Sequence, residues 1–395
     1  MRNSLLAVLA ATSLIGACKW TDFDDLEDTT WVRSTQDPEI GSSDYPVAIA
    51  GVSTGTSGGT LAVISDDISK YSLIAYTAEG GDSVNTAQAV SLGGQQIGAV
   101  SDTPVFVTDP AGRIALVERS SNGGGNFAVF FGAATSPAGL EFAATTQPAP
   151  APDAAVFVPN GANFDLVFAA GNSIYTLAAA GGTPVSCMGM DNNNMPLQVA
   201  ALDHDGTNLW VWTKTGSLIS YPISALTPCN GGNLPAPGAT SFTPTGGFMP
   251  SAGARAHVVG GFAILSGRPS GGSAGSVFVV NLSNLTQVGS TLMIEGLRTT
   301  VTATLEGETY LVAGVPARNV DGVPAGEVDL HRFDAASGAL DALPALSVHD
   351  TDPESGQQFG RAVTTMTFNG SPILVVGAKA EIFAYYRTAL YEDRR

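Results

Sequence analysis

Apolar residues along this chain recur in short runs of four to eight positions, bounded by glycine, proline, asparagine, aspartate and serine. Such runs predict β-strands separated by turns. Beyond the N-terminal segment, almost no apolar residues follow the spacing of a helix. The first strand of each unit is predicted at 45–51, 103–107, 164–168, 208–213, 262–265, 310–314 and 372–377, and most are followed by a second alternating strand, as at 59–64, 173–177, 275–280 and 326–331.

These units recur seven times with a loose period of about 54 residues, which is typical of propeller repeats. In a ring of such units each sheet covers the apolar faces of its neighbours, which explains the near-continuous apolar runs. We therefore predict an all-β fold over residues 44–395: a β-propeller of seven blades, each a four-stranded antiparallel sheet. The alternative is a pair of β-sandwich domains joined near the proline run 148–152. In a propeller the same run would be a loop between two blades.

Composition limits the classes of partner. The chain has 395 residues, of which 44% are hydrophobic and 13% charged, and this balance argues against wholesale disorder. Its formal net charge is −18. Nucleic acid needs clustered cations and is therefore not an expected partner. Direct attraction to anionic lipid head groups is disfavoured for the same reason.

The N-terminal segment has the three parts of an export signal: Arg2, an apolar core at 5–11, and the sequence Leu-Ile-Gly-Ala-Cys at 14–18. That last sequence resembles the lipobox of bacterial lipoproteins. The resemblance implies removal of residues 1–17, a diacylglyceryl thioether on Cys18, and a third acyl chain, such as palmitate, on its new amino group. Several chains together give stable membrane anchoring. An ordinary secretory signal and an uncleaved helix are the alternatives, but the apolar stretch is shorter than the roughly 20 residues that span a bilayer.

Lys19 follows the cysteine, and by resemblance to the same family it suggests the outer membrane, since aspartate there tends to retain a lipoprotein in the inner membrane. The acidic stretch 22–28 predicts a solvated tether, which we assign to residues 18–43 together with the lipidated cysteine. Whether the domain faces the periplasm or the cell exterior stays open.

Cys187 and Cys229 are the remaining cysteines. An exported chain matures in an oxidising compartment, and both cysteines lie beside turn residues. We predict a disulfide between them, which would close a loop of about 40 residues and contribute about 4 kcal/mol. Two buried free thiols are the alternative.

The last unit carries Gln-Phe-Gly-Arg-Ala-Val at 358–363 and Ile-Leu-Val-Val-Gly-Ala at 373–378, and the unit before it keeps a glycine and a proline. These sequences resemble the FG-GAP repeat of integrin-type propellers over about the last third of the chain. The resemblance implies structural roles for the motif residues Phe359, Gly360, Gly377, Ala378, Gly314 and Pro316. The stretch 203–213 resembles the hairpin of sensor-type propellers, with Asp205-Gly206 as its tight turn.

Calcium-binding blades of the FG-GAP family place aspartates between the two motif elements, but residues 364–372 contain no carboxylate. We therefore expect no calcium there. Two acidic loops remain, at 350–356 and at Asp203, Asp205 and Asn208, and neither has the Asp-x-Asp-x-Asp-Gly spacing. We interpret both as solvated turns, with calcium as the alternative, and predict no cofactor.

The candidate catalytic residues form no known constellation. His204, His257, His331 and His349 lack the spacing of metal ligands. Because His331 alternates with Asp329 along a strand, we expect it to face solvent. No nucleophile or phosphate-binding motif is present, and the glycine-rich run 122–126 is interpreted as a flexible loop.

The sequence therefore favours a non-catalytic binding or adhesion module that presents propeller loops to a protein or polysaccharide, displayed from the outer membrane by lipid on Cys18. One alternative is a periplasmic scaffold in outer-membrane assembly, because residues 333–338 resemble a repeat of the propellers found there. The other is a propeller enzyme that uses an acid in its central channel.

Overall fold

The computed structural model describes residues 31–33, 46–53, 58–65, 70–77, 84–91, 104–119, 125–133, 138–143, 150–191, 193–227, 229, 231–237, 241–251, 253–305, 307–350, 353–368, 371–379 and 381–385. Regular structure in these ranges consists of β-strands and one short 3-10 helix, η1 (Ile223–Ala225). The fold is therefore all-β, as the apolar runs predict. No helix in these ranges has the length and apolarity needed to cross a membrane.

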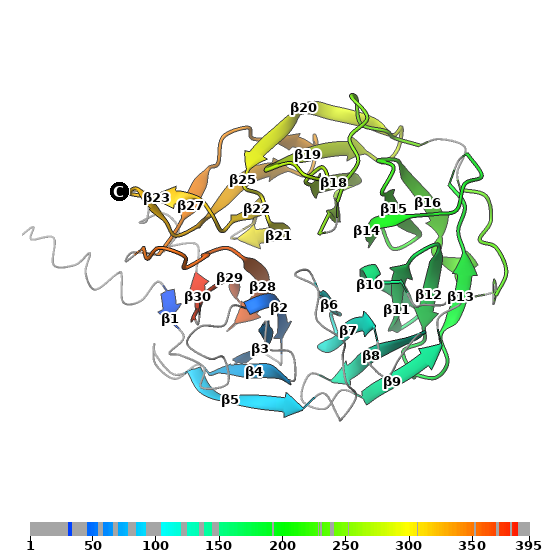
Figure 1. Cartoon of the computed structure of the whole chain (residues 1–395), viewed down its shortest axis with the longest axis horizontal. Helices are drawn as coiled ribbons and strands as arrows, with labels where there is room; N and C mark the ends of the chain where they lie inside the picture. Colours follow the sequence, from blue (N-terminus) through cyan, green and yellow to red (C-terminus); the bar gives the residue numbers. More distant parts are fainter. Residues whose placement is uncertain are drawn as a thin grey trace, which may run out of the picture.

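The strands form successive antiparallel sheets, which Figure 1 shows arranged radially around a common centre. Each sheet after the N-terminal strand begins with the strand nearest that centre, here called its inner strand. The first sheet is β2 (Pro46–Ser53), β3 (Gly58–Ser65), β4 (Lys70–Thr77) and β5 (Val84–Ser91). The second is β6 (Val105–Thr108), β7 (Arg113–Arg119), β8 (Asn126–Ala133) and β9 (Ala138–Ala143). The third is β10 (Pro152–Asn160), β11 (Asn163–Ala170), β12 (Ser173–Leu177) and β13 (Val185–Met188).

The remaining sheets continue around the ring. The fourth is β14 (Val199–His204), β15 (Asn208–Thr213) and β16 (Leu218–Pro222). The fifth is β17 (Arg255–Val259), β18 (Phe262–Gly267), β19 (Ala274–Asn281) and β20 (Thr286–Glu295). The sixth is β21 (Thr299–Leu305), β22 (Glu308–Val315), β25 (Glu327–Asp334), β26 (Ala339–Leu340) and β27 (Leu346–Val348), with the small ribbon of β23 (Asn319–Val320) and β24 (Val323–Pro324) beside it. The last sheet is β28 (Ala362–Phe368), β29 (Ser371–Ala378), β30 (Glu381–Tyr385) and β1 (Trp31–Arg33).

The ring is closed by strands from opposite ends of the chain. Trp31 pairs with Tyr385 and Arg33 with Phe383, so β1 is the outermost strand of the last sheet. At the centre, β2 of the first sheet contacts β28 of the last. Part of the range assigned to the tether therefore belongs to the ring. Closure gives the last sheet a neighbour on both faces, which is the way a β-propeller protects its strands.

The structure around the proline run excludes the alternative of two β-sandwich domains joined there. Pro152 begins β10, whose strand contacts both β6 before it and β14 after it. The chain thus continues around one ring through this point, and the radial sheets define a propeller architecture.

Two sheets depart from the four-stranded prediction. Within the described residues the fourth sheet has three strands, and its outer edge receives an isolated bridge between Leu218 and Phe242. The segment that carries Phe242 is rich in proline and glycine, and proline cannot donate to a ladder. In the sixth sheet the outer edge is shared, because β26 and β27 pair with opposite ends of β25.

The first strands of the predicted units are not equivalent in the structure. The described parts of the runs at 45–51 and 103–107 lie in the inner strands β2 and β6. The later runs lie instead in second strands, such as β11, β18 and β22. These second strands are almost continuously buried, whereas the inner strands β17 and β21 are only partly buried. From the third sheet onward the strongest apolar run therefore marks the second strand of a sheet, because the inner strand has one edge at the central channel.

Aromatic packing joins the second and third sheets. Phe168 stacks on Tyr175 with ring centroids 4.9 Å apart, and Phe127 meets both rings edge-on at 5.8 and 5.3 Å. All three side chains are almost fully buried. Edge-on and stacked pairs of this kind add about 0.5–1.5 kcal/mol each beyond their buried area.

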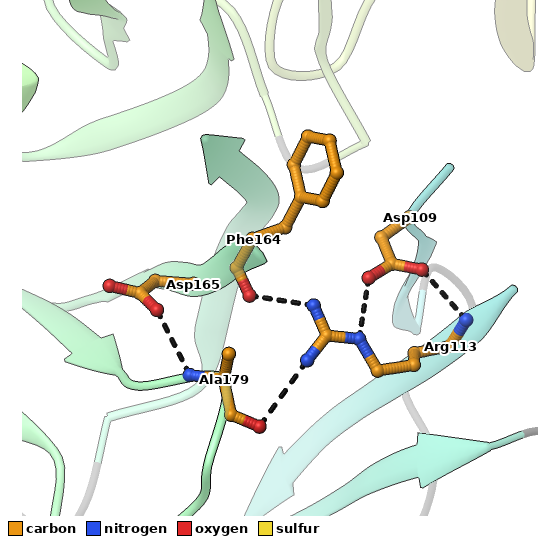
Figure 2. Close-up of polar contacts among 5 residues, drawn as sticks. All are labelled: Asp109, Arg113, Phe164, Asp165 and Ala179. Carbon is orange, nitrogen blue, oxygen red and sulfur yellow. Dashed lines mark hydrogen bonds and ion pairs between the residues drawn. The ribbon is translucent and has the colours of Figure 1, made fainter. Parts of the chain in front are cut away.

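A charged clamp lies at the edge of the same interface (Figure 2). Arg113 donates from Nε to Asp109 Oδ2 at 2.6 Å, and its other nitrogens donate to the carbonyl oxygens of Phe164 and Ala179 in the third-sheet region, at 2.7 and 3.3 Å. Asp165 accepts from the Ala179 N–H and holds that loop in place. One guanidinium thus satisfies acceptors from two sheets.

Glycine packing joins the sixth sheet to the last. A Cβ on Gly314 would lie 2.1 Å from Gly360 O, and Gly360 itself has a positive φ of 86°. Phe359 is fully buried, and its N–H donates to Ala325 O of the sixth-sheet region. Gly360 N donates to Gly377 O. The Phe-Gly pair therefore lets two backbones approach more closely than side chains would permit.

Candidate functional site

The centre of the ring contains a cavity of about 460 Å³. Every inner strand in the described sheets contributes residues to its lining, from β2 through β28. Figure 1 shows these strands surrounding the common centre. Ligand pockets commonly measure about 300–1,000 Å³, so the cavity can hold a small molecule or a short segment of a partner.

Three arginines line one arc of the cavity. Arg255 begins β17, Arg298 directly precedes β21, and Arg361 directly precedes β28. Arg255 Nη1 donates to the carbonyl oxygen of Ala254 at 3.1 Å, and Arg361 Nη1 donates to Gln358 Oε1 at 3.1 Å. Burial and the nearby Arg298 lower the pKa of Arg255. An anion would be stabilised beside such a group.

The cavity carboxylates lie on the third and fourth sheets. Asp153 accepts from Lys214 Nζ at 2.5 Å, and burial raises its pKa although Lys214 acts in the opposite direction. Asp203 accepts from its neighbour His204 N and from Val258 N of the fifth sheet, at 2.8 and 2.6 Å. Burial raises the pKa of Asp203 against these two hydrogen bonds. Both acids are engaged in links between neighbouring sheets.

His257 belongs to a polar link between the fifth and sixth sheets. Its Nε2 lies 3.1 Å from Thr300 O and 3.0 Å from Thr300 Oγ1, and Thr300 Oγ1 lies 2.6 Å from Ser266 Oγ. Burial, with Arg255 nearby, lowers the pKa of His257 to about 4. The imidazole is therefore neutral at physiological pH and serves as a hydrogen-bonding group beside the cavity.

Apolar residues also line the cavity, among them Ile49, Val105 and Val156 of the first three sheets. They are not confined to one side, since Ala256, Val301 and Val363 line the cavity on the sheets that carry the arginines. Such low-dielectric walls strengthen the field of the charges they face.

The acidic stretch at 203–208 separates into two parts with different roles. Asp205 accepts from the backbone N–H groups of Thr207 and Asn208 and from Trp210 Nε1, at 2.8, 2.7 and 2.9 Å. These bonds lower its pKa and, with Gly206 at a φ of +88°, form the expected tight turn. Asp203 was predicted to be in a solvated turn; it lies in β14 instead and is largely buried against the fifth sheet.

The acidic loop at 350–356 also differs from a solvated turn. Asp350 is buried and accepts from Gln357 Nε2, while residues 351 and 352 lie outside the described part. Among the described residues no group of three or more histidine, cysteine, aspartate and glutamate side chains could hold a metal ion.

The histidines occupy four separate environments. His331 was predicted to face solvent, but it and Asp329 are each 2% exposed. The prediction assumed one solvated sheet face, whereas both faces of β25 are covered in the ring. Asp329 accepts from Arg318 Nη1 and Ser347 Oγ, and His331 Nδ1 lies 3.0 Å from Asp341 O. His204 Nδ1 accepts from Gly206 N, and His349 Nδ1 lies 2.8 Å from Asp350 O.

The predicted cysteine pair is together in the structure. Cys187 of β13 and Cys229 form a disulfide with Cα atoms 5.8 Å apart. It ties the outer strand of the third sheet to the segment after η1. Of the FG-GAP motif residues, Phe359, Gly360, Gly314 and Gly377 meet at the junction described above, Ala378 is fully buried, and Pro316 O faces Gly326 at this junction. Cys18, residues 1–17 and residues 122–124 of the glycine-rich run 122–126 lie outside the described residues.

Sequence reasoning missed the arginines and His257 as members of one site. Each is a single residue in a separate unit, so no local motif connects them. A usable signal exists: Lys and Arg together number 17 in the whole chain, and three of the arginines stand at the start of an inner strand. Aligning the units by inner strand would place Arg298 and Arg361 at equivalent positions, since each directly precedes the residue paired with a second-strand glycine, Gly314 or Gly377.

Solved structures with the same architecture include BBS1N in complex with ARL6DN. The mercury-soaked crystal structure matches with a TM-score of 0.56 at 13% sequence identity, covering 91% of this chain and 98% of that chain. The lead-soaked structure matches with a TM-score of 0.54 at 13% identity, covering 90% and 96%. At this identity the likeness concerns the fold. No protein-family model matches the sequence, and a search of curated proteins gives no match.

Proposed function

We propose that this protein is a lipid-anchored, non-catalytic binding module of the bacterial envelope. The observation that carries the binding role is the cavity of about 460 Å³ among the inner strands, and the lipid anchor rests on the sequence at 14–18. Strands hold site residues more rigidly than loops do, and a concave, preformed site at the centre of a ring is suited to binding.

We propose further that the ring is a propeller of seven blades, formed by the first to sixth sheets and the last sheet. The successive contacts between inner strands, from β2 through β28 and back to β2, support this number. The FG-GAP resemblance belongs to the same proposal. The close packing of Gly314 against Gly360 explains why the motif has glycine at these positions.

The partner in this proposal is a protein or a polysaccharide held by the loops on one face of the ring. Loops on a rigid scaffold commonly carry recognition. The matched BBS1N structures contain BBS1N in complex with ARL6DN, which supports a protein partner for a propeller of this shape. The net charge of −18 argues for a partner other than nucleic acid.

The anchor is tested by lipid labelling of the full chain in a bacterial host. With an alkyne analogue of palmitate, we expect labelling of the wild type and its recovery in the membrane fraction. Cys18→Ser should lose both, because the acyl chains attach to that residue. Cys229→Ser removes a different cysteine and should retain the label. A Cys18→Ser chain that is still labelled would overturn the anchor.

Protease treatment of intact cells then locates the domain. Cleavage would support display on the cell surface, and protection would support a scaffold on the periplasmic side of the outer membrane. Binding itself is measured with the purified chain on arrays of bacterial surface polysaccharides and solubilised envelope proteins, with a heat-unfolded sample as control. Catalytic turnover in a panel of hydrolase, lyase and dehydrogenase substrates would contradict the non-catalytic assignment.

A further inference from the structure

The disulfide between Cys187 and Cys229 fastens two neighbouring sheets to each other. The two cysteines are 42 residues apart, and all three strands of the fourth sheet, β14 to β16, lie between them. Cys187 belongs to β13, the outer strand of the third sheet, whereas Cys229 follows η1 beyond the fourth sheet. The bond therefore brings the chain that leaves the fourth sheet back to the outer edge of the third.

Residues 231–234, here called the clip segment, lie along the outer edge of β13. Three backbone hydrogen bonds join the two, from Gly231 N to Ser186 O at 2.7 Å, from Met188 N to Gly232 O at 3.0 Å, and from Leu234 N to Met188 O at 2.8 Å. A parallel bridge between Asn233 and Met188 belongs to the same pairing. The clip segment thus adds to the third sheet and satisfies backbone groups that an edge strand otherwise leaves unpaired.

The chain on either side of the clip segment is held on the fourth sheet. Before it, Leu226 is buried, and its N–H donates to Ile223 O in η1. After it, Phe242 exchanges two backbone hydrogen bonds with Leu218 of β16. The clip segment can therefore leave β13 while both flanking parts of the chain keep their places.

The disulfide supplies the attachment that the clip segment lacks by itself. Apart from the backbone bonds, the segment is held by Leu234, which is 5% exposed and packs in the apolar cluster between the third and fourth sheets. Gly231, at a φ of +80°, and Gly232 lose much conformational freedom when they are ordered. Few contacts therefore oppose a large entropic cost, and the covalent bond keeps the segment in place.

The two sulfurs differ in their access to a reductant. Cys187 is 1% exposed, whereas Cys229 is only partly buried. A thiol therefore attacks Cys229 Sγ, forms a mixed disulfide with it, and releases Cys187 as a thiolate that takes up a proton. A second thiol attacks the reductant's sulfur and releases Cys229, which leaves two cysteine thiols and one oxidised reductant. Leu226 O, 3.2 Å from both sulfurs, can then accept the S–H of Cys187.

We propose that the clip segment is a redox-sensitive switch: it pairs with β13 while Cys187 and Cys229 are bonded, and it is released locally when a thiol reductant cleaves that bond. Release leaves Ser186 O and both backbone polar groups of Met188 unpaired, beside a Met188 side chain that is already 48% exposed. The ring stays closed, because contacts between inner strands, such as β10 with β14, hold it. The inference does not depend on the proposed binding role of the cavity.

The experiment is amide hydrogen exchange, measured by mass spectrometry on the full chain before and after reduction with dithiothreitol. We expect the amides of Gly231 and Leu234 to exchange at least tenfold faster in the reduced chain, because each loses its acceptor on β13. Amides of β11, which is paired on both edges, should keep their rates. Unchanged exchange in the clip segment, or equal acceleration in β11, would overturn the inference.

Variants assign the response to this bond. Cys229→Ser should show fast exchange in the clip segment without reductant and no further change when reductant is added. The matched control is Cys18→Ser, which removes a cysteine outside the pair and should keep both the slow exchange and the full response. Slow exchange in Cys229→Ser would contradict the role of the bond. Reoxidation of the wild type with oxidised glutathione should restore protection, and a failure to do so would exclude a switch.

A second measurement uses the reduced wild type and needs no variant. Iodoacetamide should modify Cys229 at least tenfold faster than Cys187, because only the clip side of the bond is released while Cys187 stays in the buried cluster. Mass spectrometry of the two cysteine peptides over time gives both rates. Equal rates would show that β13 itself leaves the third sheet, and the inference of a local release would fail.

Discussion

Two interfaces between neighbouring sheets are packed with residues of opposite size. Between the second and third sheets, the large rings of Phe127, Phe168 and Tyr175 fill the space. Between the sixth and last sheets, Gly314 and Gly360 bring two backbones almost into contact. The spacing of sheets in the ring is therefore not set by one type of side chain. Each junction matches its residues to the local separation of the strands.

We therefore expect opposite changes in side-chain volume to destabilise the two interfaces. The aromatic junction should be sensitive to loss of volume, and the glycine junction to gain of volume, because interiors are packed to a fixed density. Two titratable groups lie near these junctions: Glu118, buried in β7 of the second sheet, and His257, half-buried in β17 of the fifth sheet, which neighbours the sixth. These two groups allow the comparison to be extended to pH.

The largest effect is expected from Phe168→Ala. Phe168 is fully buried, and its removal leaves a cavity between two rings, so the free energy of unfolding should fall by about 4 kcal/mol. Chemical denaturation of the full chain measures the change. Phe168→Leu keeps most of the volume and should cost about 1 kcal/mol. Equal losses in the two variants would show that ring packing does not hold this junction.

Gly314→Ala should follow, with a loss of about 3 kcal/mol or more, because the new Cβ would meet a backbone oxygen that cannot move aside freely. The control is Gly289→Ala, at a positive φ of 66° with nothing within 4 Å of the added Cβ. Backbone strain alone should cost that variant about 1 kcal/mol. A smaller loss for Gly314→Ala than for the control would contradict close backbone approach.

Glu118→Gln should stabilise the protein at and above neutral pH. Burial raises the pKa of Glu118 from 4.5 to about 7, so the folded state favours the protonated acid. That contribution is complete below pH 4.5 and is lost as the pH rises through 7, where the folded chain must hold a buried charge. We expect the variant to gain about 2 kcal/mol over the wild type at pH 8 and little at pH 4.5. A gain that does not change with pH would refute the assignment.

The smallest effect is expected from His257. This residue should reduce the free energy of unfolding as the pH falls, whereas Glu118 reduces it as the pH rises. Its pKa falls from 6.5 to about 4 on folding, so the folded state favours the neutral ring. The contribution is complete above pH 6.5 and declines as the pH falls toward 4. Between pH 7.5 and 5.5 the wild type should lose about 1 kcal/mol from this group.

His257→Gln isolates the contribution of the imidazole. Its unfolding free energy should change less than that of the wild type over the same pH interval, because the amide does not titrate. The measurement is the unfolding free energy of both chains at each pH, and parallel curves would exclude His257 as the source.

The sequence by itself determined the strand content, the turn at Asp205-Gly206 and the pairing prediction for Cys187 and Cys229. These features depend on residues close together in the chain or on a scarce residue type. Alternation of apolar and polar residues is sufficient to predict a strand, and a glycine or aspartate at a turn is sufficient to predict where it ends. The prediction of His331 as solvent-facing failed because alternation cannot reveal that a second sheet covers the other face.

Only the tertiary structure decided ring closure, the two kinds of sheet junction and the composition of the cavity. β1 and β30 pair across nearly the whole chain, which no local pattern specifies. Arg255, Arg298 and Arg361 come together because consecutive sheets start their inner strands at the same end of the channel. Their proximity is a product of the topology, since each arginine by itself is an isolated charge in a different unit.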